Sequence, residues 1–122
     1  MTELTRTEEK IMQALWAMGK GFVKDIIARL DDDPPPAYTT VSTIIRILEQ
    51  KGFVGYRAFG KTYEYYPLVT KEAYRKKSFG QLMTGYFNGK PTEVLSFLVQ
   101  EHQLDEQEIT AIKKLIDSHT KN

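Results

Sequence analysis

The stretch YTTVSTIIRILEQKG, residues 38 to 52, decides the fold of this chain. Its apolar residues recur at i, i+3, i+4 and i+7, the spacing of a helical face that packs against a core. These residues are Val41, Ile44, Ile45 and Leu48. The opposite face is polar and has no acidic side chain, so this helix can lie in the major groove of DNA without repelling phosphate. We call it the reading helix. That face consists of Thr39, Thr43, Arg46 and Gln50.

A β-hairpin is predicted directly after the reading helix. Gly52 is the kind of residue that ends a helix, and segments 54–59 and 62–66 alternate in the pattern of two paired strands around a short turn. Pro67 closes the second strand, because it has no amide hydrogen to give to a ladder. We interpret this hairpin as the wing of a DNA-binding unit.

The wing carries residues for two different kinds of contact. Arg57 and Lys61 are spaced to reach the sugar-phosphate backbone beside the groove. The tyrosines can pack a ring inward and leave a hydroxyl outward. An alternative is a winged-helix protein–protein interaction module without DNA binding, for which the aromatic residues would form the contact patch. These residues are Tyr56, Phe59, Tyr63, Tyr65 and Tyr66.

Two helices that support the reading helix are predicted upstream. In residues 4–19, Thr5 and Glu8 fit a capping box, and an apolar stripe follows. A shorter amphipathic helix covers residues 22–30 and ends at three aspartates and three prolines. Two helices, a connection, a reading helix and a hairpin make a winged helix-turn-helix, so the predicted fold class is mainly α with a small β-hairpin.

The three aspartates, residues 31–33, raise a metal-site hypothesis. Consecutive side chains point in different directions, however, and no further ligand is placed nearby. We therefore expect a solvated helix end and no metal. The connection at residues 31–38 is longer than the three- or four-residue turn of a minimal helix-turn-helix.

Beyond the wing, the sequence predicts helices whose apolar faces are too large to remain exposed. Thr70 can cap a long helix through Phe87, and Pro91 suits the first turn of a short one. Asp105 and Glu108 fit a capping box for a last helix. We expect the apolar residues of these helices to form a dimer interface. They are Leu82, Met83, Tyr86, Phe87, Leu95, Leu98, Ile109, Ile112, Leu115 and Ile116.

The predicted domains are a winged-helix DNA-binding domain at residues 1–69 and a helical dimerisation domain at residues 70–122. Roughly 50 residues bury too little apolar surface for an independent monomeric core, which favours pairing with a second copy. The alternative is that these helices fold back on the winged helix of the same chain. A two-fold pair would present two reading helices to a pseudo-palindromic operator with half-sites about 34 Å apart, or a multiple of that distance.

Composition limits the compartment and locates the basic charge. The chain has 122 residues, a formal net charge of +1 and no cysteine. Residues 39–77 hold 8 Lys or Arg against 3 Asp or Glu, so the basic charge is concentrated around the reading helix and the wing. We expect no membrane span, because no stretch is long and apolar enough, and no signal peptide, because residues 1–10 are polar and charged. This composition favours a cytoplasmic protein.

An enzyme is the alternative from a different class. The histidines, His102 and His119, lie on separate predicted helices, and neither accompanies residues that would form a nucleophile, a metal site or a phosphate loop. Serines and threonines are frequent but lack the spacing of a catalytic triad. We expect no catalytic activity, no cofactor and no small-molecule substrate.

The order of these segments resembles the penicillinase repressors, the BlaI/MecI group of transcriptional repressors. The segments that carry the resemblance are LTRTEEKIMQALW (4–16), YTTVSTIIRILEQKGFV (38–54), GKTYEYYP (60–67) and EVLSFLVQEHQLDEQEI (93–109). The resemblance implies a homodimeric winged-helix repressor that is induced by proteolysis. In the antibiotic-responsive members, a membrane-bound sensor with a zinc-peptidase domain triggers cleavage within the tail, and the weakened dimer leaves its operator.

Carried across by position, the resemblance places the groove helix at residues 39–50. Thr40 and Thr43 then stand at the family's DNA-contacting threonines, with Ser42 and Arg46 as their neighbours. Ile47 stands where the family often has a basic residue, so the operator preference is expected to differ.

The resemblance also implies a cleavage site. The inducing cut maps onto the bond between Ser96 and Phe97, where Ser96 replaces the asparagine of the best-known members. The family's copper-responsive branch uses cysteines in its tail, which this chain lacks. Copper sensing is therefore not expected.

Overall fold

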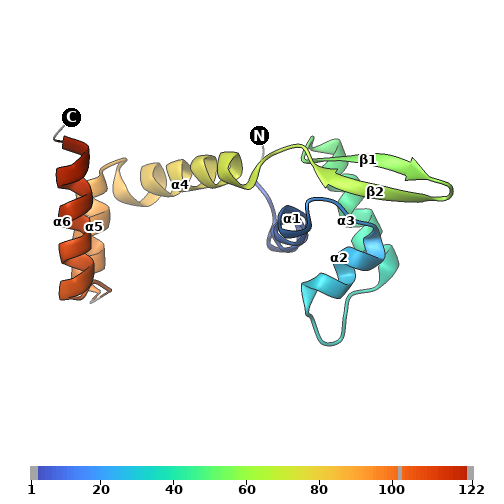
Figure 1. Ribbon diagram of the computed structural model, residues 1–122, viewed down its shortest axis with the longest axis horizontal. Coiled ribbons are helices and arrows are strands. Elements are labelled where there is room, and N and C mark those ends of the chain that lie inside the picture. The colour runs from blue at the N-terminus through green and yellow to red at the C-terminus, as the bar shows by residue number, and fades with distance from the viewer. Residues whose placement is uncertain (1–2, 102, 121–122) are drawn as a thin grey trace. The chain divides into compact units, whose positions relative to one another are not determined.

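The structure is a computed structural model that describes residues 3–101 and 103–120, so the expectations for His102 fall outside the described residues. Within these ranges the structure consists of helices and one two-stranded antiparallel hairpin, and the predicted fold class is confirmed. The order is α1 (Arg6–Met18), α2 (Val23–Leu30), α3 (Tyr38–Gln50), β1 (Val54–Phe59), β2 (Thr62–Pro67), α4 (Lys71–Phe87), α5 (Pro91–Gln100) and α6 (Glu106–Thr120) (Figure 1). One compact unit ends at Ser78 and a second begins at Phe79.

Helix α1 begins with the predicted capping box. The Thr5 hydroxyl accepts a hydrogen bond from the Glu8 amide at 3.2 Å, and the Glu8 carboxylate accepts one from the Thr5 amide at 2.8 Å. At the other end Gly19 adopts a φ of +83° and its amide donates to the Leu15 carbonyl. A residue with a Cβ would adopt that φ only at a cost, so glycine ends the helix here.

Helix α2 is also defined by short acidic residues at its ends. Asp25 Oδ2 accepts a hydrogen bond from the Phe22 amide at 3.1 Å, and Asp31 ends the helix in the left-handed region with a φ of 56°. Asp32 forms a surface ion pair with Lys10 at 3.2 Å. Among the described residues, no group of three His, Asp or Glu side chains gathers as metal ligands would.

The core of the first unit is apolar and draws on α1, α2, α3 and the start of β1. Its fully buried large residues are Ile11, Met12, Leu15, Ile26, Val41, Ile45, Leu48, Phe53 and Val54. The predicted inner face of α3 is thus confirmed, with Ile44 partly buried against the same core. Each such side chain contributes about 1.5 to 3 kcal/mol when it leaves water, so this burial fixes the rotation of α3 about its own axis.

The hairpin is attached to the helices along β2. Strands β1 and β2 pair from Val54↔Pro67 to Phe59↔Thr62. The tight turn between them places Gly60 at a φ of +61°. Gly21, just before α2, forms an isolated bridge with Tyr65, with hydrogen bonds of 2.9 and 2.8 Å. The wing is therefore tied by main-chain hydrogen bonds to the segment that leads into α2.

The start of α4 belongs to the first unit. Tyr74 is buried, its hydroxyl accepts a hydrogen bond from the Leu4 amide at 3.1 Å, and its ring packs against Phe53 and Trp16. Trp16 Nε1 donates to the Val69 carbonyl at 2.8 Å. These contacts join the segment after the wing to α1.

The second unit contains the end of α4 with α5 and α6. Phe87 of α4 contacts Phe97 of α5, with ring centroids 5.6 Å apart. Pro91 starts α5 as predicted, and Asp105 accepts a hydrogen bond from the Glu108 amide at the start of α6. No residue of α5 or α6 is buried. Within the described ranges, none of the helices has the length and apolar character needed to cross a bilayer.

Candidate nucleic-acid interface

The outward face of α3 is an exposed row of uncharged or basic side chains. Because the opposite face is packed into the core, the direction of this row is fixed by the fold. The structure brings together here the residues that were predicted to contact DNA from α3. They are Thr39, Thr40, Thr43 and Arg46, all exposed, and Ser42, which is half-buried.

The orientation of Thr43 defines what it can recognise. Its hydroxyl donates a hydrogen bond to the Thr39 carbonyl at 2.9 Å. The hydroxyl hydrogen is therefore engaged within the helix, and the oxygen keeps its lone pairs for a donor. Amino groups of adenine and cytosine are such donors in the major groove, and the threonine methyl suits the methyl group of thymine.

Ile47 adds an apolar group to the same region. Its side chain is 39% exposed and follows Thr43 by one helical turn. Without charge or hydrogen-bonding groups, it can make only apolar contact with a base edge, of which the thymine methyl is the example in the major groove. The chemistry at this position differs from that of a basic residue.

The register of the hairpin separates its side chains into two faces. Residues paired across antiparallel strands share a face, and neighbours along a strand alternate. Tyr56 pairs with Tyr65, and Tyr63 lies two residues before Tyr65, so these three rings lie together. Arg57 pairs with Glu64 on the other face. We call the face with the three rings the tyrosine face.

Of the tyrosine face, only one ring is buried. Tyr65 is 5% exposed, whereas Tyr56 and Tyr63 are 48% and 45% exposed. The rings of Tyr56 and Tyr63 are therefore only partly covered by the rest of the protein. Tyr65 is buried because β2 is hydrogen-bonded at this residue to the segment before α2. No helix residue covers Tyr56 or Tyr63 fully.

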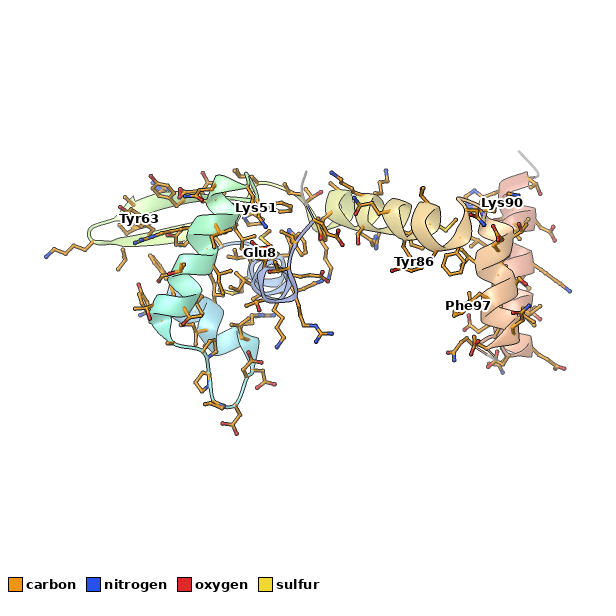
Figure 2. All side chains as sticks on the ribbon, turned by 180° about the vertical axis from the view of Figure 1, so that it is seen from behind. Glu8, Lys51, Tyr63, Tyr86, Lys90 and Phe97 are labelled. Carbon is orange, nitrogen blue, oxygen red and sulfur yellow. The ribbon has the colours of Figure 1, made fainter. Side chains whose placement is uncertain are left out.

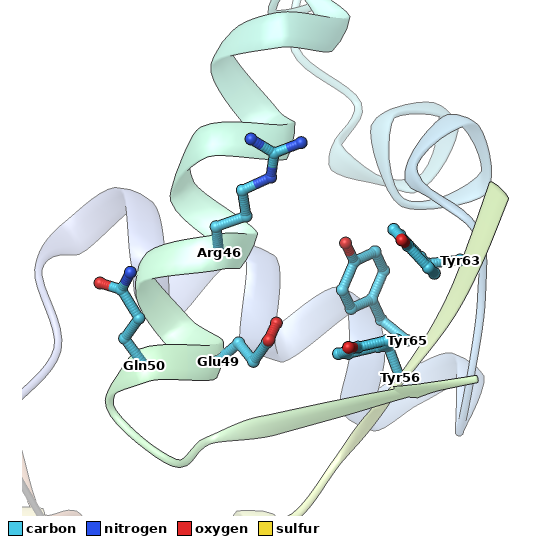
Figure 3. A pocket seen from close by; sticks show the side chains of 6 residues that line it. All are labelled: Arg46, Glu49, Gln50, Tyr56, Tyr63 and Tyr65. Atoms are coloured by element: carbon cyan, nitrogen blue, oxygen red, sulfur yellow. The ribbon is translucent and has the colours of Figure 1, made fainter. Parts of the chain in front are cut away.

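A cleft of about 350 Å³ separates the tyrosine face from α3, and sequence reasoning did not predict it. Its lining residues are Arg46, Glu49, Gln50, Tyr56, Tyr63 and Tyr65. Figure 3 shows the Glu49 carboxylate pointing across the cleft toward the tyrosines, and Gln50 pointing away from them. The cleft therefore has a helix wall with both charges and a hairpin wall made of phenol rings.

Burial changes the acidity of the innermost phenol. Burial raises the pKa of Tyr65 above its ordinary value, and the nearby negative charge of Glu49 raises that pKa further, while Arg46 acts in the opposite direction. Tyr65 therefore remains a neutral phenol at physiological pH. The hairpin wall of the cleft presents no negative charge from this residue.

The two basic residues of the wing lie in different surroundings. The Arg57 guanidinium lies over the Phe59 ring, 5.4 Å from its centroid, on the face away from the tyrosines. Phe59 in turn contacts Phe22. Lys61 is exposed in the turn at the tip of the wing. The tip of the wing therefore carries Lys61, whereas Arg57 lies within β1, on the face of the hairpin opposite the tyrosine cleft.

Lys51 is not a free surface cation. Its Nζ lies 2.8 Å from Glu8 Oε1 and 2.9 Å from Glu8 Oε2, across 43 residues of sequence (Figure 2). Burial raises the pKa of Glu8, but hydrogen bonds from Lys51 and Thr5 outweigh burial, so that its pKa lies below the ordinary value. No local pattern in the sequence could have indicated this pair.

The residues predicted to form a dimer interface are at best partly buried within one chain. The most exposed is Tyr86, at 80% (Figure 2), followed by Leu115 at 60%. Ile116 and Leu82 are also exposed. The half-buried residues of this set are Met83, Phe87, Leu95, Leu98, Ile109 and Ile112.

The bond predicted as the cleavage site lies inside a helix. Ser96 and Phe97 are both exposed and both belong to α5. The Ser96 hydroxyl accepts a hydrogen bond from the Gln100 side chain at 3.4 Å, and Phe97 contacts Phe87. A protease that binds its substrate as an extended strand would need α5 to open first.

Comparison with known proteins adds independent information on this arrangement. The family model described as "Penicillinase repressor" matches residues 4–118. The methicillin resistance regulatory protein MecI of Staphylococcus aureus (strain N315) is 21% identical over 115 residues, which cover 94% of each chain. An uncharacterised 16.5 kDa protein of Latilactobacillus sakei is 23% identical over 93% of this chain and 78% of its own length.

A solved structure supports the fold. A MarR family protein from Bacillus stearothermophilus superimposes with a TM-score of 0.52 over 98% of this chain and 75% of that chain. The sequence identity is 12%. At this identity the likeness concerns the fold alone.

Proposed function

This chain belongs to the penicillinase repressor family and is a transcriptional repressor; from that premise we propose that it is a cytoplasmic homodimer that binds a pseudo-palindromic operator and is released by proteolysis in its C-terminal region. The observation that carries the proposal is the outward face of α3. Its threonine hydroxyls and its guanidinium group are exposed and lack negative charge, and they are held in place by an opposite face of which Val41, Ile45 and Leu48 are fully buried. None of these groups carries a negative charge that would repel phosphate when the face enters a major groove.

On the operator, α3 and the wing make different kinds of contact. Thr39, Thr40, Ser42, Thr43 and Arg46 contact base edges and the adjacent phosphates. Lys61 and Arg57 contribute positive charge toward the sugar-phosphate backbone. The residues of α3 specify the DNA sequence. The two wing residues add affinity only, because phosphate contacts carry no sequence information directly.

Dimerisation follows from the apolar surface of the second unit. Leu82, Tyr86, Leu115 and Ile116 expose large apolar groups to water in the single chain, and no residue of α5 or α6 is buried. Burial of such surface contributes about 25 cal/mol per Å². A second copy can cover this surface by two-fold symmetry and would place two α3 helices on one face of a duplex.

Release would occur by cutting between Ser96 and Phe97. The cut would divide α5 and remove Phe97 from its contact with Phe87. The half-helices left are too short to be stable in water on their own, so the apolar surface that pairs the copies would be lost. The resemblance to the antibiotic-responsive members suggests a membrane-bound sensor zinc peptidase as the partner in this step.

Selection of bound duplexes from a random DNA pool, followed by a salt titration, tests the repressor. We expect an enriched sequence with two-fold symmetry, and log affinity that falls linearly with log salt, with a slope of about 0.9 for each phosphate neutralised. A protein that binds no duplex at low ionic strength, or shows no salt dependence, would instead support the protein-interaction module.

A further inference from the structure

We propose that the wing holds one DNA strand through the hydroxyl groups of Tyr56 and Tyr63, with the strand passing along the cleft beside α3. This inference rests on the proposed function, because it names further contact residues in the same DNA interface. It differs from the expectation drawn from charge alone, in which Arg57 and Lys61 provide the contacts of the wing. The hairpin register distinguishes these two models of the wing contact, because it shows which side chains share a face.

The tyrosine hydroxyls lie on the correct side of the hairpin. Tyr56 and Tyr63 line one wall of the cleft. The opposite wall is α3, which contributes Arg46 from its outward face. Arg57 belongs to the other face of the hairpin, opposite Glu64. A backbone that runs between the groove helix and the wing therefore meets phenol groups before it meets the guanidinium of Arg57.

The two rings are held in place before any ligand arrives. The centroids of Tyr56 and Tyr63 are 4.8 Å apart in an edge-to-face arrangement, and both rings contact the buried Tyr65. Tyr56 and Tyr63 remain nearly half exposed. Little side-chain entropy is lost when such a hydroxyl binds a ligand, because packing already restricts the ring.

The charges of the helix wall define where a phosphate can lie. Arg46 attracts it, whereas the Glu49 carboxylate, which points across the cleft toward the tyrosines, repels it from the part of the cleft next to Glu49 (Figure 3). A phosphate is therefore favoured on the Arg46 side of the cleft, where the uncharged hydroxyls of Tyr56 and Tyr63 on the hairpin wall can donate to its oxygens. Glu49 itself is left to accept a hydrogen bond from a base amino group.

The test compares tyrosine-to-phenylalanine variants on the two faces of the same hairpin. The full-length chain is titrated with a duplex that the unmodified protein has selected from a random pool. We expect Tyr56→Phe and Tyr63→Phe each to bind roughly tenfold more weakly, the size expected for a hydrogen bond to a charged acceptor. Tyr66→Phe is the matched control, because Tyr66 is 39% exposed and pairs with Gly55 on the opposite face.

A second measurement identifies the acceptor. Single phosphates of the duplex are replaced by uncharged methylphosphonates, and the affinity of each protein is measured again. At the phosphate that a tyrosine contacts, the replacement should weaken binding of the unmodified protein and have much less effect on the phenylalanine variant. Additive losses at every phosphate would overturn the assignment to the backbone.

The outcomes distinguish this inference from the proposed function. If Tyr56→Phe and Tyr63→Phe bind DNA as the unmodified protein does while Arg46→Ala binds more weakly, the inference is overturned and the proposed repressor function stands. An equal loss in Tyr66→Phe would overturn the assignment to one face. Failure of the unmodified protein to bind any duplex would overturn the proposed function itself. Thermal unfolding of each variant, expected to match the unmodified protein because every ring is kept, accompanies each titration.

Discussion

Lys51 forms an ion pair with Glu8 that joins the end of α3 to the first turn of α1, with a distance of 2.8 Å between Nζ and Oε1. The side chain of Glu8 is 6% exposed and that of Lys51 is 27% exposed. The same carboxylate caps α1 through the Thr5 amide. One buried acid thus connects the start of the domain to the helix proposed to read DNA.

Removal of either partner should reduce stability, but unequally. Lys51→Ala leaves a buried carboxylate without its cation and should lower the free energy of unfolding by about 3 kcal/mol. Glu8→Gln should cost less, because glutamine can still complete the capping box and the partly exposed Lys51 can turn to water. Urea unfolding of both variants measures the difference, and equal losses would contradict this explanation.

The pH dependence of stability should have an acid limb caused by Glu8. Its pKa is lower in the folded protein than the ordinary value of 4.5, so the folded state binds fewer protons than the unfolded state in this range. The resulting stabilisation is complete above pH 4.5 and is lost as the pH falls through the folded pKa. Unfolding measured in urea between neutral and acid pH should show a shallower decline for Glu8→Gln than for the unmodified protein.

Arg46→Ala should weaken operator binding by about 1 to 3 kcal/mol and leave the fold unchanged, because the side chain points outward from α3 and is exposed. Arg6→Ala removes the same kind of side chain from an exposed position of α1 and serves as the control. Gel-shift titrations on the selected duplex measure both. Unchanged binding of Arg46→Ala would remove this residue from the interface.

A charge on the apolar surface of α6 should separate the copies. Leu115→Glu places a carboxylate at a side chain that is 60% exposed in the single chain and is proposed to be covered in the dimer. Lys114→Glu introduces the same residue on the side of α6 that faces away from its apolar surface. Analytical ultracentrifugation should show monomers for the first variant and dimers for the second. A dimer that persists in Leu115→Glu would place the interface elsewhere.

The predicted helices and strands agree with the structure where local rules apply. The capping box of Thr5 and Glu8, the stripe of Val41, Ile45 and Leu48, and the turn at Gly60 all depend on residues close in sequence. Such patterns repeat with the period of a helix or a strand, so they can be read without knowledge of the fold.

The candidate site was predicted less completely than the fold. The outward face of α3 follows from its buried face and was predicted correctly as an exposed surface. The exposure of Tyr56 and Tyr63 was not predicted, because alternation shows which residues share a hairpin face but not which face looks toward a helix. The cleft beside Glu49 was missed for the same reason.

The sequence by itself determined the helices, the hairpin and the inner side of α3, because each follows from contacts between residues a few positions apart. Only the tertiary structure decided that Lys51 neutralises Glu8, that Trp16 binds the Val69 carbonyl and that the tyrosine face lies opposite Arg46. These relationships join segments that are separated by tens of residues. They depend on how the helices and the hairpin pack, and that packing is selected by burial of the whole core rather than by any one local pattern.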